Sequence, residues 1–288
     1  MDDLKKLSET WVKSRAYDPA IQRQLWDRAA LDYRELKIPD PKENAFLRHM
    51  RTALPLDASL RTLDVGCGSG IYSMALAPYV QEAVGIDISP NMIRYAKERS
   101  RALGLSNTAF HCLDWSEADV EQLGFSDGFD IVFAHMTPAV DDYQTFDKLN
   151  RCSRKLCMVE KPARRRDRIQ DGAFAQIGLR PCNAQDQGGI LQAFSYLWYH
   201  GYCPQLSYQE DEWESEKTVE DMTAWCTDRA RLQRKLTAAE EAAIARFVEG
   251  QAKDGMVLEV TKTTRVTILW RVELAHNGKN PNTERWNF

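Results

Sequence analysis

The sequence feature that most constrains the fold is a regular alternation, from Leu60 onward, of short apolar runs with helix-like segments. Strands are predicted at Leu60–Val65, Glu82–Ile86, Thr108–Leu113, Phe129–Ala134 and Lys155–Glu160. Helices are predicted between them at Ser69–Tyr79, Pro90–Leu103 and Asp142–Cys152. Parallel strands joined by crossover helices produce this order, and their short connections favour right-handed crossovers. The pattern therefore predicts an α/β fold with a doubly wound, mostly parallel, seven-stranded Rossmann-like sheet.

Helical patterns precede this region. Asp18-Pro19 has the form of an N-cap followed by proline in the first helical turn, and apolar residues spaced by four continue the pattern to about residue 35. A second helical stretch covers about residues 41–53. We therefore expect N-terminal helices over residues 1–54, which act as a lid over a core at residues 55–163.

The pattern changes after Pro162, where helical segments replace the alternation. Helices are predicted at Leu191–His200, Thr218–Leu236 and Thr237–Val248, of which the last two open with capping-box patterns. The segment at residues 164–254 is therefore predicted to be a helical insertion. We expect it to form the binding site of the molecule on which the protein acts, which is called the acceptor site below. The segment contains a run of aromatic residues, for which a role as a wall of that site is slightly favoured over a role in the core. The run consists of Phe194, Tyr196, Trp198, Tyr199 and Tyr202.

The last part of the chain has the pattern of a β-hairpin. Val257–Val260 and Arg265–Arg271 alternate apolar with polar residues on either side of Thr261–Thr264. We therefore predict a C-terminal hairpin at residues 255–275 that completes the sheet, followed by a polar tail at residues 276–288.

Composition limits the partners of the chain. Its 38 basic and 42 acidic residues are well mixed and give a net charge of -4, which argues against nucleic acid or an anionic membrane as a partner. Met1–Thr10 is polar and has no apolar stretch for a signal sequence or a membrane span, so the protein is expected to be cytoplasmic. The 7 cysteines include no C-x-x-C pair, which predicts reduced, mostly buried thiols and no metal site.

The strongest functional signal is the glycine-rich segment that runs from Asp64 to Gly70, where a buried strand ends and a helix begins. Gly66, Gly68 and Gly70 let backbone approach a ligand closely, and the start of the following helix favours an anionic group. Asp64, at the end of the strand, is suited to an ammonium group. A ligand that carries both charges at one end is therefore expected here.

Two further strand ends add polar groups to the same edge of the predicted sheet. Asp87 ends the second strand, which is where a doubly wound fold binds the hydroxyls of a ribose. Asp114 and Trp115 follow the third strand and offer a hydrogen-bond acceptor and a flat apolar surface suited to adenine. Ordinary turn chemistry is the competing explanation for Asp114. Together the strand ends predict an adenosyl ligand.

Over residues 60–160 the chain resembles the class I S-adenosylmethionine-dependent methyltransferases, in the branch that handles small metabolites. The resemblance implies that S-adenosylmethionine is the cofactor and that Asp64, Gly66, Gly68 and Gly70 surround its methionine moiety. It also implies that Asp87 holds the ribose, that Asp114 faces the adenine amine and that Trp115 packs beside that base.

The fourth-strand segment from Asp130 to His135 resembles the part of the family that lies under the methyl group. Ala134 is therefore expected to line the cofactor site, and His135 to lie near the reacting centre. His135 is the candidate general base for an acceptor that is protonated at working pH, such as a hydroxyl. A histidine that is hydrogen-bonded at the strand end for structural reasons is the competing interpretation.

Three alternatives to a small-molecule methyltransferase remain. A nicotinamide dinucleotide would need G-x-G-x-x-G, but the third glycine falls on Ile71 or Ser73, so an NAD-dependent oxidoreductase ranks well below. A non-catalytic protein that binds the adenosyl cofactor would have the same loop. A protein or RNA methyltransferase is disfavoured by the net negative charge. The sequence identifies neither the acceptor nor the oligomeric state.

Overall fold

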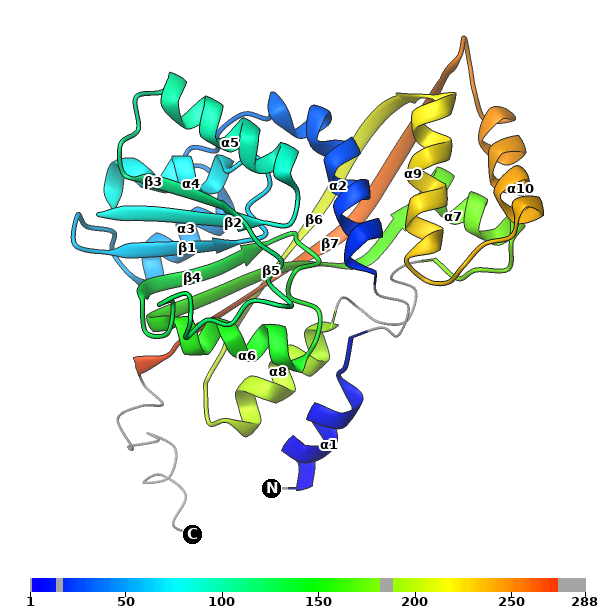
Figure 1. Cartoon of the computed structure of the whole chain (residues 1–288). Helices are drawn as coiled ribbons and strands as arrows, with labels where there is room; N and C mark the ends of the chain where they lie inside the picture. Colours follow the sequence, from blue (N-terminus) through cyan, green and yellow to red (C-terminus); the bar gives the residue numbers. More distant parts are fainter. Residues whose placement is uncertain (1, 14–17, 182–188, 274–288) are drawn as a thin grey trace.

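One twisted sheet runs through the computed structural model, which describes residues 2–13, 18–181 and 189–273 (Figure 1). Its seven strands lie in the order β3-β2-β1-β4-β5-β7-β6. Their bounds are β1 Arg61–Val65, β2 Glu82–Asp87, β3 Thr108–Cys112, β4 Phe129–His135, β5 Ser153–Asp167, β6 Gln205–Thr218 and β7 Met256–Arg271. Strands β1 to β5 are parallel, whereas β7 pairs antiparallel with both β5 and β6. The predicted doubly wound, mostly parallel seven-stranded sheet is confirmed.

The order of the strands reverses between β1 and β4, because β2 and β3 extend the sheet to one side and β5 to the other. In open α/β sheets the crevice for ligands lies at such a switch point, at the carboxyl ends of the strands. The topology therefore places the glycine-rich segment after β1 beside the end of β4.

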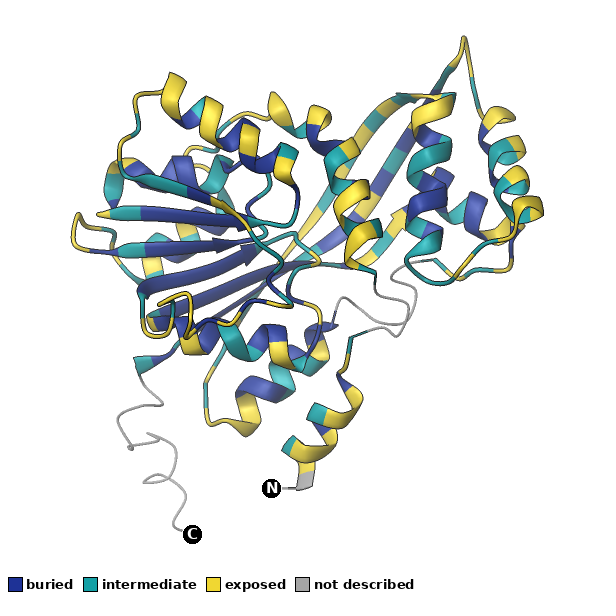
Figure 2. Cartoon of the chain, viewed as in Figure 1, coloured by how far each residue is buried: buried dark blue, intermediate teal, exposed yellow. Residues whose placement is uncertain are grey.

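Helices cover both faces of the parallel strands. One face packs against α3 Ala45–Ala53, α4 Ile71–Leu76 and α5 Pro90–Ala102, and the short 3-10 helix η1 Ala77–Tyr79 follows α4. The other face packs against α1 Asp2–Thr10, α6 Tyr143–Cys152 and α8 Ile190–Tyr199. Successive residues of β4 alternate between the two clusters, with Val132 in one and Phe133 in the other. Burial on both faces explains why these strands are nearly continuous apolar runs, as Figure 2 shows.

A third group of helices packs on the far part of the antiparallel strands. It consists of α7 Arg168–Gln176, α9 Val219–Arg231 and α10 Ala238–Glu249, whose apolar cluster includes Phe174, Cys226 and Ile244. The remaining helix, α2 Pro19–Arg34, lies between this group and the parallel strands (Figure 1). Of the predicted domain ranges, residues 164–254 contain these three helices together with α8 and β6. The predicted polar tail at 276–288 lies outside the described residues.

Predicted helix starts are confirmed by their capping contacts. The Asp18 carboxylate accepts from the backbone N–H of Ala20 at 2.8 Å and so caps α2. Thr237 and Glu240 form a reciprocal capping box at α10. Helix α1 was not predicted, and its docking depends on Trp11, which packs against Phe146 of α6 with ring centroids 5.3 Å apart. No helix in the described ranges combines the length and the apolar composition that a membrane crossing requires.

The predicted C-terminal hairpin is wrong, because β7 continues as one strand through Thr261–Thr264. Thr261, Thr263 and Thr264 are buried there, and each hydroxyl donates to a neighbouring strand: to Asp167, to the Ala163 carbonyl and to Glu210. Threonine favours strands when its hydroxyl finds such a partner, so a run that has a turn-like composition lies inside the sheet.

Strand β6 was missed within the predicted helical insertion. Its sequence is strongly acidic, and it lies at the edge of the sheet, where its residues alternate between half-buried and exposed (Figure 2). Charged side chains on an edge strand discourage pairing with other chains, and they also hide the strand from a search for apolar runs. Strand β5 likewise extends to Asp167, past the predicted end at Glu160.

Candidate active site

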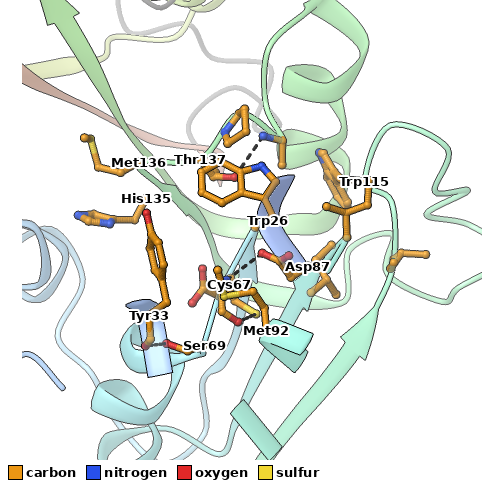
Figure 3. A pocket seen from close by; sticks show the side chains of 18 of the residues that line it. Trp26, Tyr33, Cys67, Ser69, Asp87, Met92, Trp115, His135, Met136 and Thr137 are labelled. Atoms are coloured by element: carbon orange, nitrogen blue, oxygen red, sulfur yellow. Dashed lines mark hydrogen bonds between the residues drawn. The ribbon is translucent and has the colours of Figure 1, made fainter. Parts of the chain in front are cut away.

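A cavity of about 320 Å³ lies at the carboxyl ends of β1, β2 and β4, as the topology indicates. Residues of the glycine-rich segment form one wall, and Met136, Thr137 and Pro138 after β4 form another. Trp26 and Tyr33 on α2 also line the cavity, and the Tyr33 carbonyl accepts a hydrogen bond from the Ser69 hydroxyl at 2.8 Å (Figure 3). Helix α2 therefore contributes side chains to the cavity wall, and its role as a lid stays a prediction.

The three glycines of the loop have different surroundings. Gly66 has φ +72°, and an added Cβ would lie 2.1 Å from the Thr137 hydroxyl oxygen. Gly68 has φ +54°, but a Cβ there would meet only the Met92 sulfur, at 3.9 Å. Gly66 therefore permits a close approach of two loops, and Gly68 leaves backbone open to the cavity.

Gly70 is not part of the cavity wall. It has φ +75° and precedes α4, and a Cβ there would lie 2.5 Å from the Phe110 ring. Its predicted contact with the methionine moiety is therefore not supported by the lining, and its role is to let α4 start close to β3. Ala134 is likewise buried in the apolar core and absent from the lining.

Asp64 lies in the cavity wall and is only 3% exposed. Its carboxylate accepts a hydrogen bond from the Ser73 hydroxyl at 2.9 Å, and within the described ranges no basic side chain lies within ion-pair distance. Burial raises the pKa of Asp64 to about 7, because the charged form has lost its water and has gained a single side-chain donor. Asp64 is therefore a buried carboxyl that a cationic group would stabilise in its charged form.

Asp87 lies at the end of β2 and also lines the cavity. Its two oxygens accept from the backbone N–H of Gly68 and of Ser89, each at 2.9 Å. Burial raises the pKa of this carboxyl, while the two N–H donors act in the opposite direction. Asp87 thus joins the glycine loop to the start of α5 and keeps free lone pairs that can accept from a ligand.

Asp114, Trp115 and Lys13 meet at the other end of the cavity. Asp114 accepts from the backbone N–H and the hydroxyl of Ser116, at 2.9 and 2.7 Å. Trp115 is 2% exposed, and its indole N–H donates to the Thr145 carbonyl at 2.9 Å, so its ring is fixed in place. Lys13, which was not predicted, comes from the segment after α1, and burial lowers its pKa although nearby Asp114 acts against this.

His135, the last residue of β4, lies in the cavity wall and contacts two polar groups through one nitrogen. Its Nε2 is 2.9 Å from the Tyr72 hydroxyl and 3.0 Å from Oε1 of Glu160. Burial acts to raise the pKa of Glu160, but its contacts with His135, Thr267 and Arg265 outweigh burial and lower the pKa to about 2. Tyr72 and Glu160 were not predicted as site residues; the position of Glu160 beside the end of β4 was the available signal.

The aromatic run in α8 does not form a wall of the cavity. Tyr196 is buried in the apolar cluster between α6, α8 and the sheet and donates its hydroxyl to Asp147 at 2.5 Å, while Phe194 stacks on Trp198. The interpretation of this run as a substrate wall is therefore wrong. The described residues that line the cavity all lie between Lys13 and Ala139.

Comparisons with known proteins agree with this geometry. Residues 56–166 match a family model described as a methyltransferase domain. The chain is 36% identical over 121 residues to an uncharacterized methyltransferase, YcgJ, of Bacillus subtilis, which covers 42% of this chain and 41% of the relative. It is 41% identical over 64 residues to the 23S rRNA (uracil(1939)-C(5))-methyltransferase RlmD of Shewanella amazonensis, which covers 22% of this chain and 14% of the relative.

A solved structure extends the likeness of the fold. A phosphoethanolamine N-methyltransferase 2 of Haemonchus contortus, in complex with phosphomonomethylethanolamine and S-adenosylhomocysteine, matches with a TM-score of 0.50 and 15% identity. The match covers 90% of this chain and 60% of that protein. The chain covers less than half the length of each of the two curated relatives named above. The predicted resemblance to methyltransferases is confirmed for the core.

Proposed function

We propose that the chain is an S-adenosylmethionine-dependent methyltransferase that acts on a small molecule, because residues 56–166 match a family model described as a methyltransferase domain. The observation that supports the proposal is the cavity at the ends of β1, β2 and β4, whose lining includes Asp64, Asp87 and Asp114. The uncompensated carboxyl of Asp64 is the most specific of these groups, because it suits an ammonium and not a phosphate.

The residues present fit this cofactor at each of its parts. Asp64 would hold the ammonium group, with the open backbone of Gly68 beside the methionine moiety. Asp87 would accept from the ribose hydroxyls, and Asp114 with Trp115 would hold the adenine. We infer that Lys13 closes this last end, since it lies in the same wall. A nicotinamide dinucleotide would bring a pyrophosphate to Asp64, where two like charges would meet.

When bound, the cofactor supplies a methyl group on a positively charged sulfur, which is already activated for displacement. The protein then has to align an acceptor atom with that carbon and exclude water, and proximity supplies most of the acceleration. Trp26, Tyr33 and Tyr72 border the cavity on the acceptor side. His135 lies on the same side and would remove a proton where the acceptor carries one.

A small acceptor is favoured over RNA for two reasons. Residues of α2 and Lys13 line the cavity, whose volume of about 320 Å³ suits a small molecule better than a folded nucleic acid. The net charge of the chain is -4, whereas RNA binding gains most of its affinity from basic residues. The rRNA methyltransferase relative makes RNA the second candidate acceptor.

Calorimetry tests the cofactor, and isotope transfer tests the reaction. We expect S-adenosylmethionine and S-adenosylhomocysteine to bind and NAD not to bind. Heat of binding with NAD alone would refute the proposal. Cell extract incubated with the protein and methyl-labelled cofactor should then yield labelled small molecules by mass spectrometry. Labelled RNA would show that RNA is the acceptor in place of a small molecule. Binding of the cofactor without any methyl transfer would favour a non-catalytic cofactor-binding protein.

A further inference from the structure

The hydrogen bonds of His135 determine which of its ring nitrogens can accept a proton. Nε2 lies 3.0 Å from Oε1 of Glu160. Glu160 has a pKa of about 2, so at neutral pH it is a carboxylate that can only accept hydrogen bonds. Nε2 must therefore carry the hydrogen, since a bare nitrogen would place its lone pair against the carboxylate. In the neutral ring the lone pair is then on Nδ1.

Nδ1 is available to a ligand. Within the described ranges His135 makes its hydrogen bonds through Nε2 alone, and Nδ1 is absent from the buried side-chain atoms that lack a partner. Nδ1 is therefore not sealed in the packed interior, and it belongs to a side chain that lines the cavity. The Tyr72 hydroxyl, 2.9 Å from Nε2, accepts from the same N–H and does not occupy Nδ1.

The carboxylate of Glu160 is itself held by the neighbouring strand. His135, Glu160 and Thr267 are direct partners across β4, β5 and β7. The Thr267 hydroxyl donates to Oε2 at 2.7 Å, and Arg265 donates to Oε1 at 2.9 Å. Glu160 is only 3% exposed, so water does not compete for these contacts. The carboxylate therefore has a fixed direction toward Nε2.

We propose that Glu160 is a positioning residue that fixes the tautomer of His135 and presents Nδ1 as the base for a hydroxyl acceptor. The inference rests on the proposed methyltransferase function and adds the class of acceptor to it. A hydroxyl keeps its proton at neutral pH and so needs a base, whereas a thiolate does not. A neutral imidazole with a buried carboxylate behind it is suited to that task, because the carboxylate stabilises the imidazolium that forms.

The proton and electron balance of the step is complete. His135 takes the hydroxyl proton at Nδ1 while the acceptor oxygen bonds to the methyl carbon. The carbon–sulfur bond breaks, and its electron pair stays on sulfur. The imidazolium keeps its Nε2–H directed at Glu160 and returns the extra proton to water after the products leave.

Nitrogen-15 NMR of histidine-labelled protein tests the tautomer directly. Signals of His135 are assigned by their loss in His135→Asn, at about pH 8.5, above the ordinary titration range of histidine. We expect the Nε2–H tautomer in the wild type and a shift toward the Nδ1–H tautomer in Glu160→Gln. Glu259→Gln is the matched control, because Glu259 is a buried glutamate of β7 that binds the backbone N–H groups of Ile169 and Gln170. It should leave the His135 tautomer unchanged.

An Nδ1–H tautomer in the wild type, or an unchanged tautomer in Glu160→Gln, would overturn the proposal. Calorimetry with S-adenosylhomocysteine on the same samples separates this failure from failure of the proposed function. If S-adenosylhomocysteine binds equally to the wild type and to Glu160→Gln, the proposed methyltransferase function stands whatever the tautomer is. If it does not bind to the wild type, the proposed function itself is refuted.

The acceptor class has its own test with carbon-13 methyl-labelled cofactor and cell extract. We expect the labelled methyl in the O-methyl region of the spectrum and at least about a 10-fold slower transfer by Glu160→Gln. Label on sulfur or carbon would refute the hydroxyl acceptor. An unchanged rate of transfer by Glu160→Gln would refute the positioning role of Glu160.

Discussion

Two buried carboxyl groups, one in each half of the sheet, have opposite electrostatic situations. Asp64 on β1 and Glu160 on β5 are each 3% exposed. Burial with a single hydroxyl donor raises the pKa of Asp64 to about 7. In Glu160 the contacts with His135, Thr267 and Arg265 overcome burial and lower the pKa to about 2. Equal burial thus gives opposite shifts, and the partners decide the sign.

The difference separates a carboxyl that is prepared for a ligand from one that holds a side chain. The parallel strands β1, β2 and β4 supply the walls of the cavity, and their charged groups are left incompletely paired. The antiparallel strand β7 supplies Arg265 and Thr267, which satisfy Glu160 from within the sheet. In the proposed enzyme, the underpaired carboxyl of Asp64 would therefore meet the ligand, while the fully paired carboxylate of Glu160 would orient His135.

The largest effect is expected for His135→Asn. Asparagine keeps a polar group at the strand end but cannot take up a proton, so methyl transfer should fall by about 10²–10⁴-fold. Cofactor affinity by calorimetry should stay near that of the wild type. If instead methyl transfer is unchanged and the variant melts at a lower temperature, His135 has a structural role. Glu160 would then not orient a catalytic base.

The two carboxyl groups should respond oppositely to neutralisation. At pH 8 Glu160→Gln removes a favourable charge and should lower the free energy of unfolding by about 1–3 kcal/mol. Asp64→Asn removes a charge that is costly to bury, so it should leave the unliganded protein equally or more stable. Chemical denaturation of both variants measures the effect. A loss of stability in Asp64→Asn that equals that of Glu160→Gln would contradict the comparison.

The opposite pKa shifts of Asp64 and Glu160 also make the stability of the protein depend on pH. The pKa of Asp64 is raised on folding, so its contribution to stability is present below about pH 4 and is lost as the pH rises to about 7. The pKa of Glu160 is lowered, so its contribution is present above about pH 4.5 and is lost as the pH falls toward 2. In denaturation curves, Asp64→Asn should therefore become more stable than the wild type as the pH rises from about 4 to 7. Glu160→Gln should become less stable than the wild type as the pH rises from about 2 to 4.5.

Asp87→Ala tests the ribose contact. Loss of a charged acceptor should weaken cofactor binding by about 1–3 kcal/mol, measured by calorimetry. Asp119→Ala is the matched control, because Asp119 also accepts from backbone N–H groups in a turn, those of Glu121 and Gln122, but lies outside the cavity lining. Equal affinity in both variants would show that Asp87 only stabilises the loop.

The smallest effect is expected from pH on cofactor affinity. As the pH falls from about 8 to 6, Asp64 takes up a proton and loses its attraction for an ammonium group, so affinity should fall by up to about 10-fold. Asp64→Asn should bind more weakly at pH 8 and lose this dependence. Affinity that rises as the pH falls would show that Asp64 does not meet a cation.

Most of the candidate site was predictable from sequence because it depends on local patterns. The end of a buried strand followed by Gly66 and Gly68 fixes where backbone is open, and Asp64 and Asp87 each stand at a recognisable strand end. Gly70 and Ala134 were assigned to the cofactor by the same patterns, but the lining excludes them. A pattern places a residue at the edge of the sheet without showing which way it faces.

The sequence by itself determined the parallel sheet, its switch point and the carboxyl groups at the strand ends, because apolar periodicity and glycine position act over a few residues. Only the tertiary structure decided how His135 is held. Thr267 lies 107 residues after Glu160 in the chain, and their hydrogen bond depends on the register between β5 and β7. That register is set by packing and cross-strand pairing over the whole sheet, which local sequence does not specify.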